Sequence, residues 1–428
     1  MILKAHPIAR KELLHSFLLA AGYAAVFYCL QFFLHKAGMV GAVPDAENLL
    51  HWDGGWYKSV AERGYEFHKE ASTSGFFILF PAIWKLTHAS VWGICIINIL
   101  FFSAGFSILC RLFSLRPGTQ LLWLSVPTVY FAFVPYTEAL FFLLGSTLLY
   151  GIVRQKNGIT WLSLLLLSLT RVTTIFLLPG LLLMVLVANE RRYWYAGVRK
   201  FMWLYLSPVV LGLAAFIIFQ YVQTGVWFAY FIQQSENWGH IFMHPTFPFN
   251  SLSGNRTMWL SALAAVAGVV SFVMLIMKSV AWLARGRREE NGILITSCVY
   301  LLLILAITIF CNPSYGGNNG TNPTGIFRYT MMSPFFYVFL HYFSTGRAFR
   351  AWHYAAIILL ANFTYLAFGS YVHIQALLYF NFSTLLIVLY MMGAKKENGW
   401  QAGALIAINF FMQVQLFQQF ISTGIFPD

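Results

Sequence analysis

Residues 91–112 read VWGICIINILFFSAGFSILCRL, an apolar run whose one charged residue, Arg111, lies at its end. Such a run is long enough to cross the hydrocarbon core of a bilayer, which takes about 20 predominantly apolar residues in a helix. Similar runs recur along the chain of 428 residues, of which 59% are hydrophobic and 10% are charged. The sequence therefore predicts an all-α, polytopic transmembrane protein.

We expect about 11–13 membrane segments, some short or broken, within a single integral-membrane domain that covers residues 1–428. The segments are predicted at residues 13–35, 91–112, 119–135, 138–153, 159–171, 174–189, 201–223, 258–283, 293–311, 327–343, 352–369, 371–392 and 403–421. The fifth and sixth are too short to cross independently at a rise of about 1.5 Å per residue. We expect them to be half-helices that meet at LTRVTT, with Arg171 at the break, since a broken helix at membrane depth must be buried in protein or line a wet cavity.

The distribution of charge predicts the orientation in the membrane. If the N-terminus is cytoplasmic, most of the 27 Lys and Arg residues fall in short inside loops, in agreement with the positive-inside rule. The long segments 36–90, 224–257 and 312–326 then lie outside, and loops of this kind tend to carry function. The basic residues 1–15 precede an apolar run without a small-residue cleavage site, which predicts a retained first helix.

Other classes of site are disfavoured by the sequence. The formal net charge is +13, but the basic residues form no stripe with interleaved aromatic rings, so nucleic acid is not an expected partner. The five cysteines show no CxxC spacing and mostly lie in apolar runs, which predicts packing residues and no disulfide or zinc framework. No HExxH motif occurs, and no metal site and no cofactor is predicted. One carboxylate-held divalent cation that bridges a phosphate stays an open alternative.

Residues 51–65 read HWDGGWYKSVAERGY and gather charge, glycine and aromatic rings between apolar runs. The run from Trp56 predicts a short helix that ends at Gly64 and lies on the membrane surface. Its apolar face is expected to contain Trp56, Val60 and Ala61.

Asp53 is the leading candidate for catalysis. The two glycines that follow it free the backbone and leave room beside the carboxylate for a bulky ligand. A carboxylate at the outer face can act as a general base that removes a proton from an attacking hydroxyl. The structural alternative is a helix N-cap, a position at which Asp is preferred. Composition alone does not separate the two roles.

Three further charged residues are candidates. Glu138, in VPYTEALFF, either faces a cavity as a second acid or orienting group, or complements the dipole of the helix it begins. Arg171 lies within the membrane and needs an anionic partner, which is either a carboxylate such as Glu138 or a ligand phosphate. Arg328, in GIFRYTMMSP, is suited to bind a phosphate at the outer interface, or else extends to lipid headgroups.

Amide and aromatic side chains gather in the outer segment 224–257, among them Gln234, Trp238 and His240. Sugar ring faces stack on aromatic rings while amides bond sugar hydroxyls, so this composition resembles a carbohydrate-binding surface. The same composition fits the aromatic belt of a membrane interface. Both interpretations stay open.

The stretch HWDGGWYKSVAERGY, followed by FFILFPAIWKL, resembles the first-loop signature of the PIG-V-like mannosyltransferases. The segments VPYTEALFFLL, LTRVTTIFLLPG, TGVWFAYFIQQSENWGH and FRYTMMSPFFYVF resemble later segments of that family in the same order. The family adds the second mannose in GPI-anchor synthesis in eukaryotes and has many bacterial relatives. This chain departs from the eukaryotic pattern in being compact and in having Trp-Phe where the family often has Asp-Pro.

The resemblance implies C-type glycosyltransferase architecture and a polyprenyl-phosphate sugar as donor. It implies that Asp53, the acid of the first outer loop, is the catalytic base, and that Arg171, Arg328 and Tyr329 bind the donor phosphate. The residues expected to bind or orient substrate are His51, Trp52, Trp56, Tyr57, Glu138, Gln234, Trp238 and His240.

The expected reaction is an inverting transfer of a hexose, with mannose favoured, to a glycan or glycolipid hydroxyl. The short loops favour a bacterial relative in the cytoplasmic membrane with its active site on the outer face; the endoplasmic reticulum membrane is the alternative. A lipid-linked-sugar flippase or membrane transporter is the rival function, but it predicts charge in several spans and related halves, which the sequence lacks. A scaffold without chemistry gives no cause for the cluster at 51–65.

Overall fold

The computed structural model describes residues 10–68, 72–188, 194–247, 249, 258–285, 291–311, 321–323, 325–345, 351–368, 374–393 and 399–423. Within these residues the chain is helical and has no strand, which confirms the predicted all-α class. Parts of the predicted outer segments 36–90, 224–257 and 312–326 lie outside the described residues.

Six helices among the described residues are long and apolar enough to cross a membrane: Arg10–Lys36, Val91–Phe113, Trp194–Thr224, Trp259–Trp282, Gly292–Phe310 and Trp400–Ser422. Shorter apolar helices cover Glu138–Val153, Asn157–Ser168, Val172–Ala188 and Phe380–Leu389. Length and composition therefore agree with a polytopic helical membrane protein. Fewer helices reach full spanning length than the about 11–13 segments expected, because several predicted segments are short or broken.

The chain divides into two compact units, which are described separately. The first comprises Met1–Ser114, Tyr130–His240 and Ala281–Thr296, and the second comprises Leu115–Val129, Ile241–Val280 and Ser297–Asp428. The main elements of the first unit are α1 (Arg10–Lys36), η1 (Asn48–Leu50), α2 (Asp53–Arg63), η2 (Thr73–Gly75), α3 (Leu79–Thr87), α4 (Val91–Phe113), α6 (Glu138–Val153), α7 (Asn157–Ser168), η4 (Val172–Phe176), α8 (Leu177–Ala188), α9 (Trp194–Lys200), η6 (Phe201–Leu206), α10 (Ser207–Thr224) and α11 (Ala229–Glu236).

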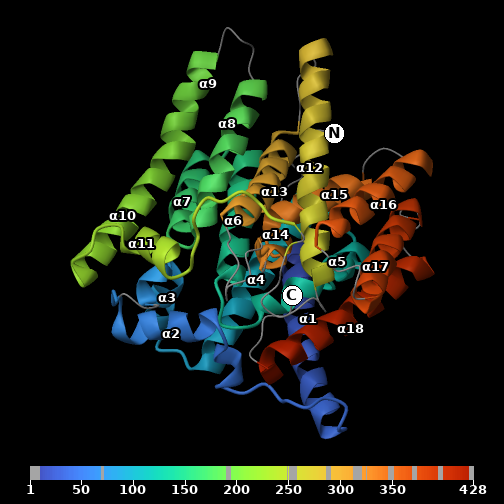
Figure 1. Ribbon diagram of the computed structural model, residues 1–428, viewed down its shortest axis with the longest axis horizontal. Helices are drawn as coiled ribbons and strands as arrows, with labels where there is room; N and C mark the ends of the chain where they lie inside the picture. The colour runs from blue at the N-terminus through green and yellow to red at the C-terminus, as the bar shows by residue number, and fades with distance from the viewer. Residues whose placement is uncertain are drawn as a thin grey trace. The chain divides into compact units, whose positions relative to one another are not determined.

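The core of the first unit is a row of apolar helices. Helix α1 packs on α4, α4 on α6, α6 on α7, and α7 on α10. Helices α2, α3 and α11 lie together at the end of this row where α10 ends (Figure 1). The two predicted outer segments of this unit, after α1 and after α10, therefore meet at one end of the bundle.

The second unit is built mainly from α5 (Pro117–Leu124), α12 (Met258–Arg285), α13 (Gly292–Phe310), α14 (Ile326–Met331), α15 (Pro334–Thr345), α16 (Ala351–Leu366), α17 (Ile374–Gly393) and α18 (Trp400–Thr423). Helix α18 packs on α5 and α17. The fully buried amide of Gln413 donates to the carbonyl oxygens of Leu124 and Val126 at 2.8 and 2.7 Å, which satisfies the open end of α5.

Two predicted spans are not single helices. Helix α5 ends at Leu124 and a 3-10 turn, η3, covers Pro127–Ala132, so the continuous span predicted at 119–135 is wrong. Pro127 lacks the amide hydrogen that an α-helix needs. The span predicted at 327–343 is likewise divided between α14 and α15, and the Ser333 hydroxyl accepts the Phe336 amide at the start of α15. Pro334 disfavours the helical conformation at the residue before it.

Other boundaries follow the predictions more closely. Helix α6 begins at Glu138 and ends at Val153, as predicted. The predicted break at LTRVTT is confirmed, since α7 ends at Ser168 and Arg171 has an extended backbone before η4. The helix predicted to begin at residue 201 begins at Trp194 instead and continues through the π-turn η6 into α10. The five cysteines are free thiols, and three of them are buried, as packing residues would be.

Helices α4 and α6 approach closely at Gly105. A Cβ atom at this position would lie 2.8 Å from the Leu143 Cα and 3.0 Å from the Leu143 amide nitrogen, which are backbone atoms that cannot turn away. A Cβ on Gly22, in α1, would meet nothing within 4 Å. The contact between α4 and α6 therefore depends on a small residue, as is common between membrane helices.

Gly105→Ala should lower the free energy of unfolding by about 1–3 kcal/mol, because overpacking forces the two backbones apart. Gly22→Ala is the matched control and should leave stability unchanged or raise it by about 0.5–1 kcal/mol, since Ala is the better helix former. Denaturant titration of the purified protein in lipid nanodiscs measures both. Equal effects of the two variants would contradict the packing described.

Candidate functional site

Asp53 is the first residue of α2, which ends at Arg63 with Gly64 at a φ of 83°. The predicted end at Gly64 is confirmed, but the helix begins at Asp53 and not at Trp56. Asp53 is not the N-cap, because Trp52 occupies that position and its side chain makes no capping bond. The half-buried carboxylate of Asp53 thus lies in the first turn of α2, where the helix dipole favours a negative charge.

The backbone just before Asp53 is held in an unusual conformation. Trp52 has a φ of 55° and a ψ of −123°, a backbone conformation that residues other than glycine rarely adopt. Such a residue costs on the order of 1–3 kcal/mol and persists only when its surroundings fix it. The Tyr136 hydroxyl donates to the His51 carbonyl oxygen at 2.9 Å and supplies one such constraint.

Gly54 supplies a second constraint. A Cβ there would lie 3.2 Å from the Leu49 carbonyl oxygen, 3.3 Å from Pro135 Cγ and 3.4 Å from the Tyr136 ring. The glycine therefore allows the start of α2 to pack directly on the turn before α6. The structure gives this glycine a packing role, while room beside the carboxylate stays a prediction from the sequence.

The buried face of α2 differs from the predicted one. Tyr57 is buried with Val60 and Ala61, whereas Trp56 is only half-buried. The Tyr57 ring lies edge-on to Phe76 at 5.2 Å and to Phe80 at 5.3 Å between ring centroids. Tyr57, Val60 and Ala61 are three and four residues apart and therefore lie on one face of α2. Through Tyr57 this face packs on the segment that follows α2.

Four buried residues, Tyr57, Thr137, Glu138 and Arg171, form what we call the Thr137 cluster. Arg171 Nε donates to Thr137 Oγ1 at 2.7 Å, and Arg171 Nη2 forms an ion pair with Glu138 Oε1 at 2.6 Å. The Tyr57 hydroxyl lies 3.3 Å from Thr137 Oγ1. The guanidinium also lies over the Phe141 ring, 5.7 Å from its centroid. The cluster joins α2, the start of α6 and the break between α7 and α8.

The cluster identifies the anionic partner that Arg171 needs. It is Glu138, the carboxylate named as one alternative, and both side chains are buried. A buried pair of this kind has no net charge, and this favours an ion pair within the protein over a phosphate ligand as the role of Arg171. The Thr137 side chain, which also could have capped α6, makes no capping bond.

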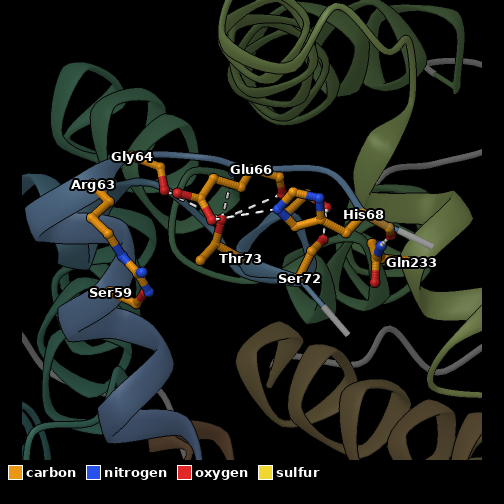
Figure 2. Close-up of polar contacts among 9 residues, drawn as sticks. Ser59, Arg63, Gly64, Glu66, His68, Ser72, Thr73 and Gln233 are labelled. Carbon is orange, nitrogen blue, oxygen red and sulfur yellow. Dashed lines mark hydrogen bonds and ion pairs between the residues drawn. The ribbon is translucent and has the colours of Figure 1, made fainter. Parts of the chain in front are cut away.

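The segment after α2 is held by its own side chains (Figure 2). Thr73 Oγ1 accepts the Glu66 amide at 2.7 Å, and the side chains of Glu66 and His68 pair at 3.6 Å. The Tyr65 hydroxyl donates to the Phe76 carbonyl oxygen at 2.8 Å. Burial raises the pKa of the Tyr65 phenol well above its ordinary value, so this group stays a neutral donor.

Helix α11 pins the same segment from the other side. Gln233 Nε2 donates to the His68 carbonyl oxygen at 2.8 Å (Figure 2), and Gln234 Nε2 donates to the Gly75 carbonyl oxygen at 3.3 Å. Gln234 Oε1 lies 2.6 Å from His240 Nδ1. Two predicted sugar ligands, Gln234 and His240, are therefore engaged within the protein.

An aromatic group completes the surroundings of α2. Trp56 stacks on Phe76 with ring centroids 5.8 Å apart, and Trp238 lies edge-on to the same ring at 6.2 Å. Ring faces of this kind are suited to contact an apolar or carbohydrate surface. The first unit thus gathers ten of the predicted residues: Asp53, His51, Trp52, Trp56, Tyr57, Glu138, Arg171, Gln234, Trp238 and His240.

The other two predicted residues, Arg328 and Tyr329, lie in α14 of the second unit. Arg328 is buried, with its guanidinium carbon 5.4 Å from the centroid of the Tyr329 ring. A buried arginine does not extend along a lipid-facing surface, so the alternative of an arginine that reaches for headgroups is disfavoured. Phosphate binding by these two residues stays a prediction from the sequence.

Sequence reasoning missed several residues that hold this site. Asn98 Nδ2 donates to the carbonyl oxygens of Val134 and Tyr136 at 2.6 and 2.9 Å, and thereby fixes the turn before α6. A single amide in the apolar run 91–112 is a signal that could have identified it, because polar groups are costly at membrane depth. Thr137 and Phe76 carry no comparable signal.

Comparison of the chain with models of protein families, with curated protein sequences and with solved structures found no match. Within the residues that the structure describes, no three His, Cys, Asp or Glu side chains lie together so that they could hold a metal ion.

Glu138→Gln should lower the free energy of unfolding by about 3–5 kcal/mol, because it leaves the Arg171 charge buried without its counter-ion. The double variant Glu138→Leu with Arg171→Met should recover much of this loss, since both charges are then removed. Glu62→Gln is the control: its partner Lys58 lies 3.8 Å away and the pair is exposed, so the change should be about 0–1 kcal/mol. Denaturant titration in nanodiscs would contradict the ion pair if Glu138→Gln behaved like Glu62→Gln.

Proposed function

We propose that this chain is a membrane glycosyltransferase of the C type. It transfers a hexose from a polyprenyl-phosphate donor to a glycan or glycolipid hydroxyl on the outer face, with inversion at the anomeric carbon. The observation that carries the proposal is the fixed placement of Asp53, a carboxylate in the first turn of a helix that is anchored on both sides to buried residues. Catalytic groups need such support from rigid elements.

Asp53 acts as the general base. Its carboxylate takes the proton of the acceptor hydroxyl while the acceptor oxygen bonds to the anomeric carbon and the bond from that carbon to the phosphate oxygen breaks. The leaving polyprenyl phosphate already carries charge and needs little help from an acid. This explains why one carboxylate suffices, and why Glu138, paired to Arg171, is assigned a positioning role.

The growing charge on the leaving phosphate needs a cation. Of the two predicted arginines, Arg171 is neutralised by Glu138. Arg328, with Tyr329, keeps the role of phosphate ligand as a prediction from the sequence.

The identity of the sugar and of the membrane comes from the resemblance. The likeness of HWDGGWYKSVAERGY to the first-loop signature of the PIG-V-like mannosyltransferases supports mannose as the hexose, and the short loops support a bacterial cytoplasmic membrane. The stacked rings of Trp56 and Phe76 and the neighbouring Trp238 offer faces for a sugar or an isoprenoid. The rival flippase or transporter would use Arg171 along a path, a role that a buried, paired arginine fits poorly.

Asp53→Asn should lower the rate of transfer by about 10²–10⁴-fold, the usual loss when a general base is removed, and leave stability unchanged. The measurement is transfer from radiolabelled polyprenyl-phosphate mannose to a membrane lipid and glycan extract by the purified protein. Glu62→Gln, which removes an exposed carboxylate from the same helix, should keep the wild-type rate.

Transfer at the wild-type rate by Asp53→Asn would refute the role of the base. Absence of transfer by the wild-type protein with every polyprenyl-phosphate hexose tested would refute the reaction class and favour the transporter.

A further inference from the structure

The C-terminal end of α10 continues into an apolar surface on α11. Helix α10 ends at Thr224, and Gly225 closes it with a φ of 71° and a bond from its amide to the Tyr221 carbonyl oxygen at 2.8 Å. Helix α11 begins four residues later, at Ala229. No charged residue occurs between Lys200 and Glu236, so the uncharged stretch runs past the end of the spanning helix and through most of α11.

Large apolar side chains are exposed on both sides of the turn. Those on α10 and after it include Ile218, Tyr221, Val222, Trp227, Phe228 and Phe231. Val222 is 75% exposed and Phe228 is 53% exposed. On a spanning helix, exposed side chains of this kind face the acyl chains of the bilayer. Because exposed apolar side chains continue beyond Gly225, we expect them to contact the acyl chains of the bilayer there as well.

The ring of Trp227 and the backbone of α11 are held in place by contacts with α10. Trp227 stacks on Tyr221 with ring centroids 4.0 Å apart and an interplanar angle of 13°. The backbone amide of Tyr230 donates to Gln220 Oε1 at 3.1 Å, and Gln220 Nε2 donates to the Ser74 carbonyl oxygen at 2.7 Å. Gln220 therefore attaches α11 to α10 and to η2 at once.

Helix α11 has two different faces. Ala229, Tyr230 and Gln233 are buried against the protein, while Phe228 and Phe231, three residues apart, are exposed on the other side. An amphipathic helix with aromatic residues on its free face is typical of elements that lie in the plane of the membrane interface. Trp and Tyr are enriched at the same depth, where a ring can contact both acyl chains and headgroups.

We propose that Trp227, Phe228 and Phe231 form an interfacial anchor that inserts into the boundary between headgroups and acyl chains of one leaflet. The partner is the phospholipid bilayer itself. The contact is apolar and carries no basic side chain, so it does not depend on anionic lipid. The anchor fixes the depth of α11 and of the segment around Gly75 that α11 holds.

The anchor has a consequence that rests on the proposed function. Trp238 follows α11 and contacts the Phe76 ring, which stacks on Trp56 of the helix that Asp53 begins. The site would then lie at the depth of the lipid phosphates, which is where the phosphate of a polyprenyl-linked sugar resides. The membrane contact itself does not require that activity, and its test is independent of transfer.

The test is the position of a spin label in nanodiscs of phosphatidylethanolamine and phosphatidylglycerol. Cys29 and Cys311, the two cysteines that are not buried, are replaced by alanine. Single labels are placed by Phe231→Cys and Trp227→Cys, with Val222→Cys as a bilayer reference and Glu236→Cys as a water reference. The readout is the ratio of collisions with oxygen, which concentrates in the bilayer, to collisions with a water-soluble nickel chelate.

The proposal predicts ratios at positions 227 and 231 that lie between the two references and nearer to that at position 222. The ratio should not change when phosphatidylglycerol is omitted, and transfer activity need not be present. A ratio at position 231 equal to that at position 236 would show exposure to water and overturn the anchor. Low collision rates with both reagents would show that protein covers the face, such as a second copy, and would overturn it as well.

Discussion

The arrangement of the first unit depends on a buried ion pair. Arg171 and Glu138 pair at 2.6 Å, and neither charge is in contact with solvent to any large extent. Each charge alone would be costly to bury, so each requires the other. Arg171 has an extended backbone at the break between α7 and α8, and its guanidinium pairs there with the first residue of α6. Arg171, which the sequence suggested as a phosphate ligand, thus first of all connects the break after α7 to the start of α6.

Thr137 links this ion pair to α2, the helix that begins at the candidate base Asp53. The threonine hydroxyl connects the guanidinium to Tyr57, and Tyr57 is on the buried face of the helix that Asp53 begins. The Tyr57 ring also packs on Phe76, whose carbonyl oxygen accepts the Tyr65 hydroxyl. A carboxylate at the start of a helix supported in this way has a defined position relative to the buried residues around it. That is what a general base acting on a lipid-linked substrate requires.

The sequence predicted the parts that follow from local rules. The apolar run 138–153, the helix end at Gly64 and the break at Arg171 each depend on length, on glycine or on an isolated charge. The predicted buried face of α2 was wrong, because contacts with distant segments determine which side chain is buried. Tyr57 and not Trp56 faces inward, since Thr137 and Phe80 lie on that side. The strained backbone of Trp52 has no sequence signal, since tryptophan does not favour a positive φ. The span predicted at 119–135 is not one helix, because Pro127 cannot donate the amide hydrogen that would continue α5.

The central claim is that the Thr137 cluster holds α2 in place, and amide hydrogen exchange across residues 53–63 in Thr137→Val tests it most directly. Valine keeps the shape of threonine but removes the oxygen that joins Arg171 to Tyr57. Thr147→Val is the control, because the Thr147 hydroxyl bonds only the Leu143 carbonyl oxygen of its own helix among the contacts described. The account predicts faster exchange in α2 for Thr137→Val and wild-type exchange for Thr147→Val. Unchanged exchange in α2 for Thr137→Val would contradict it.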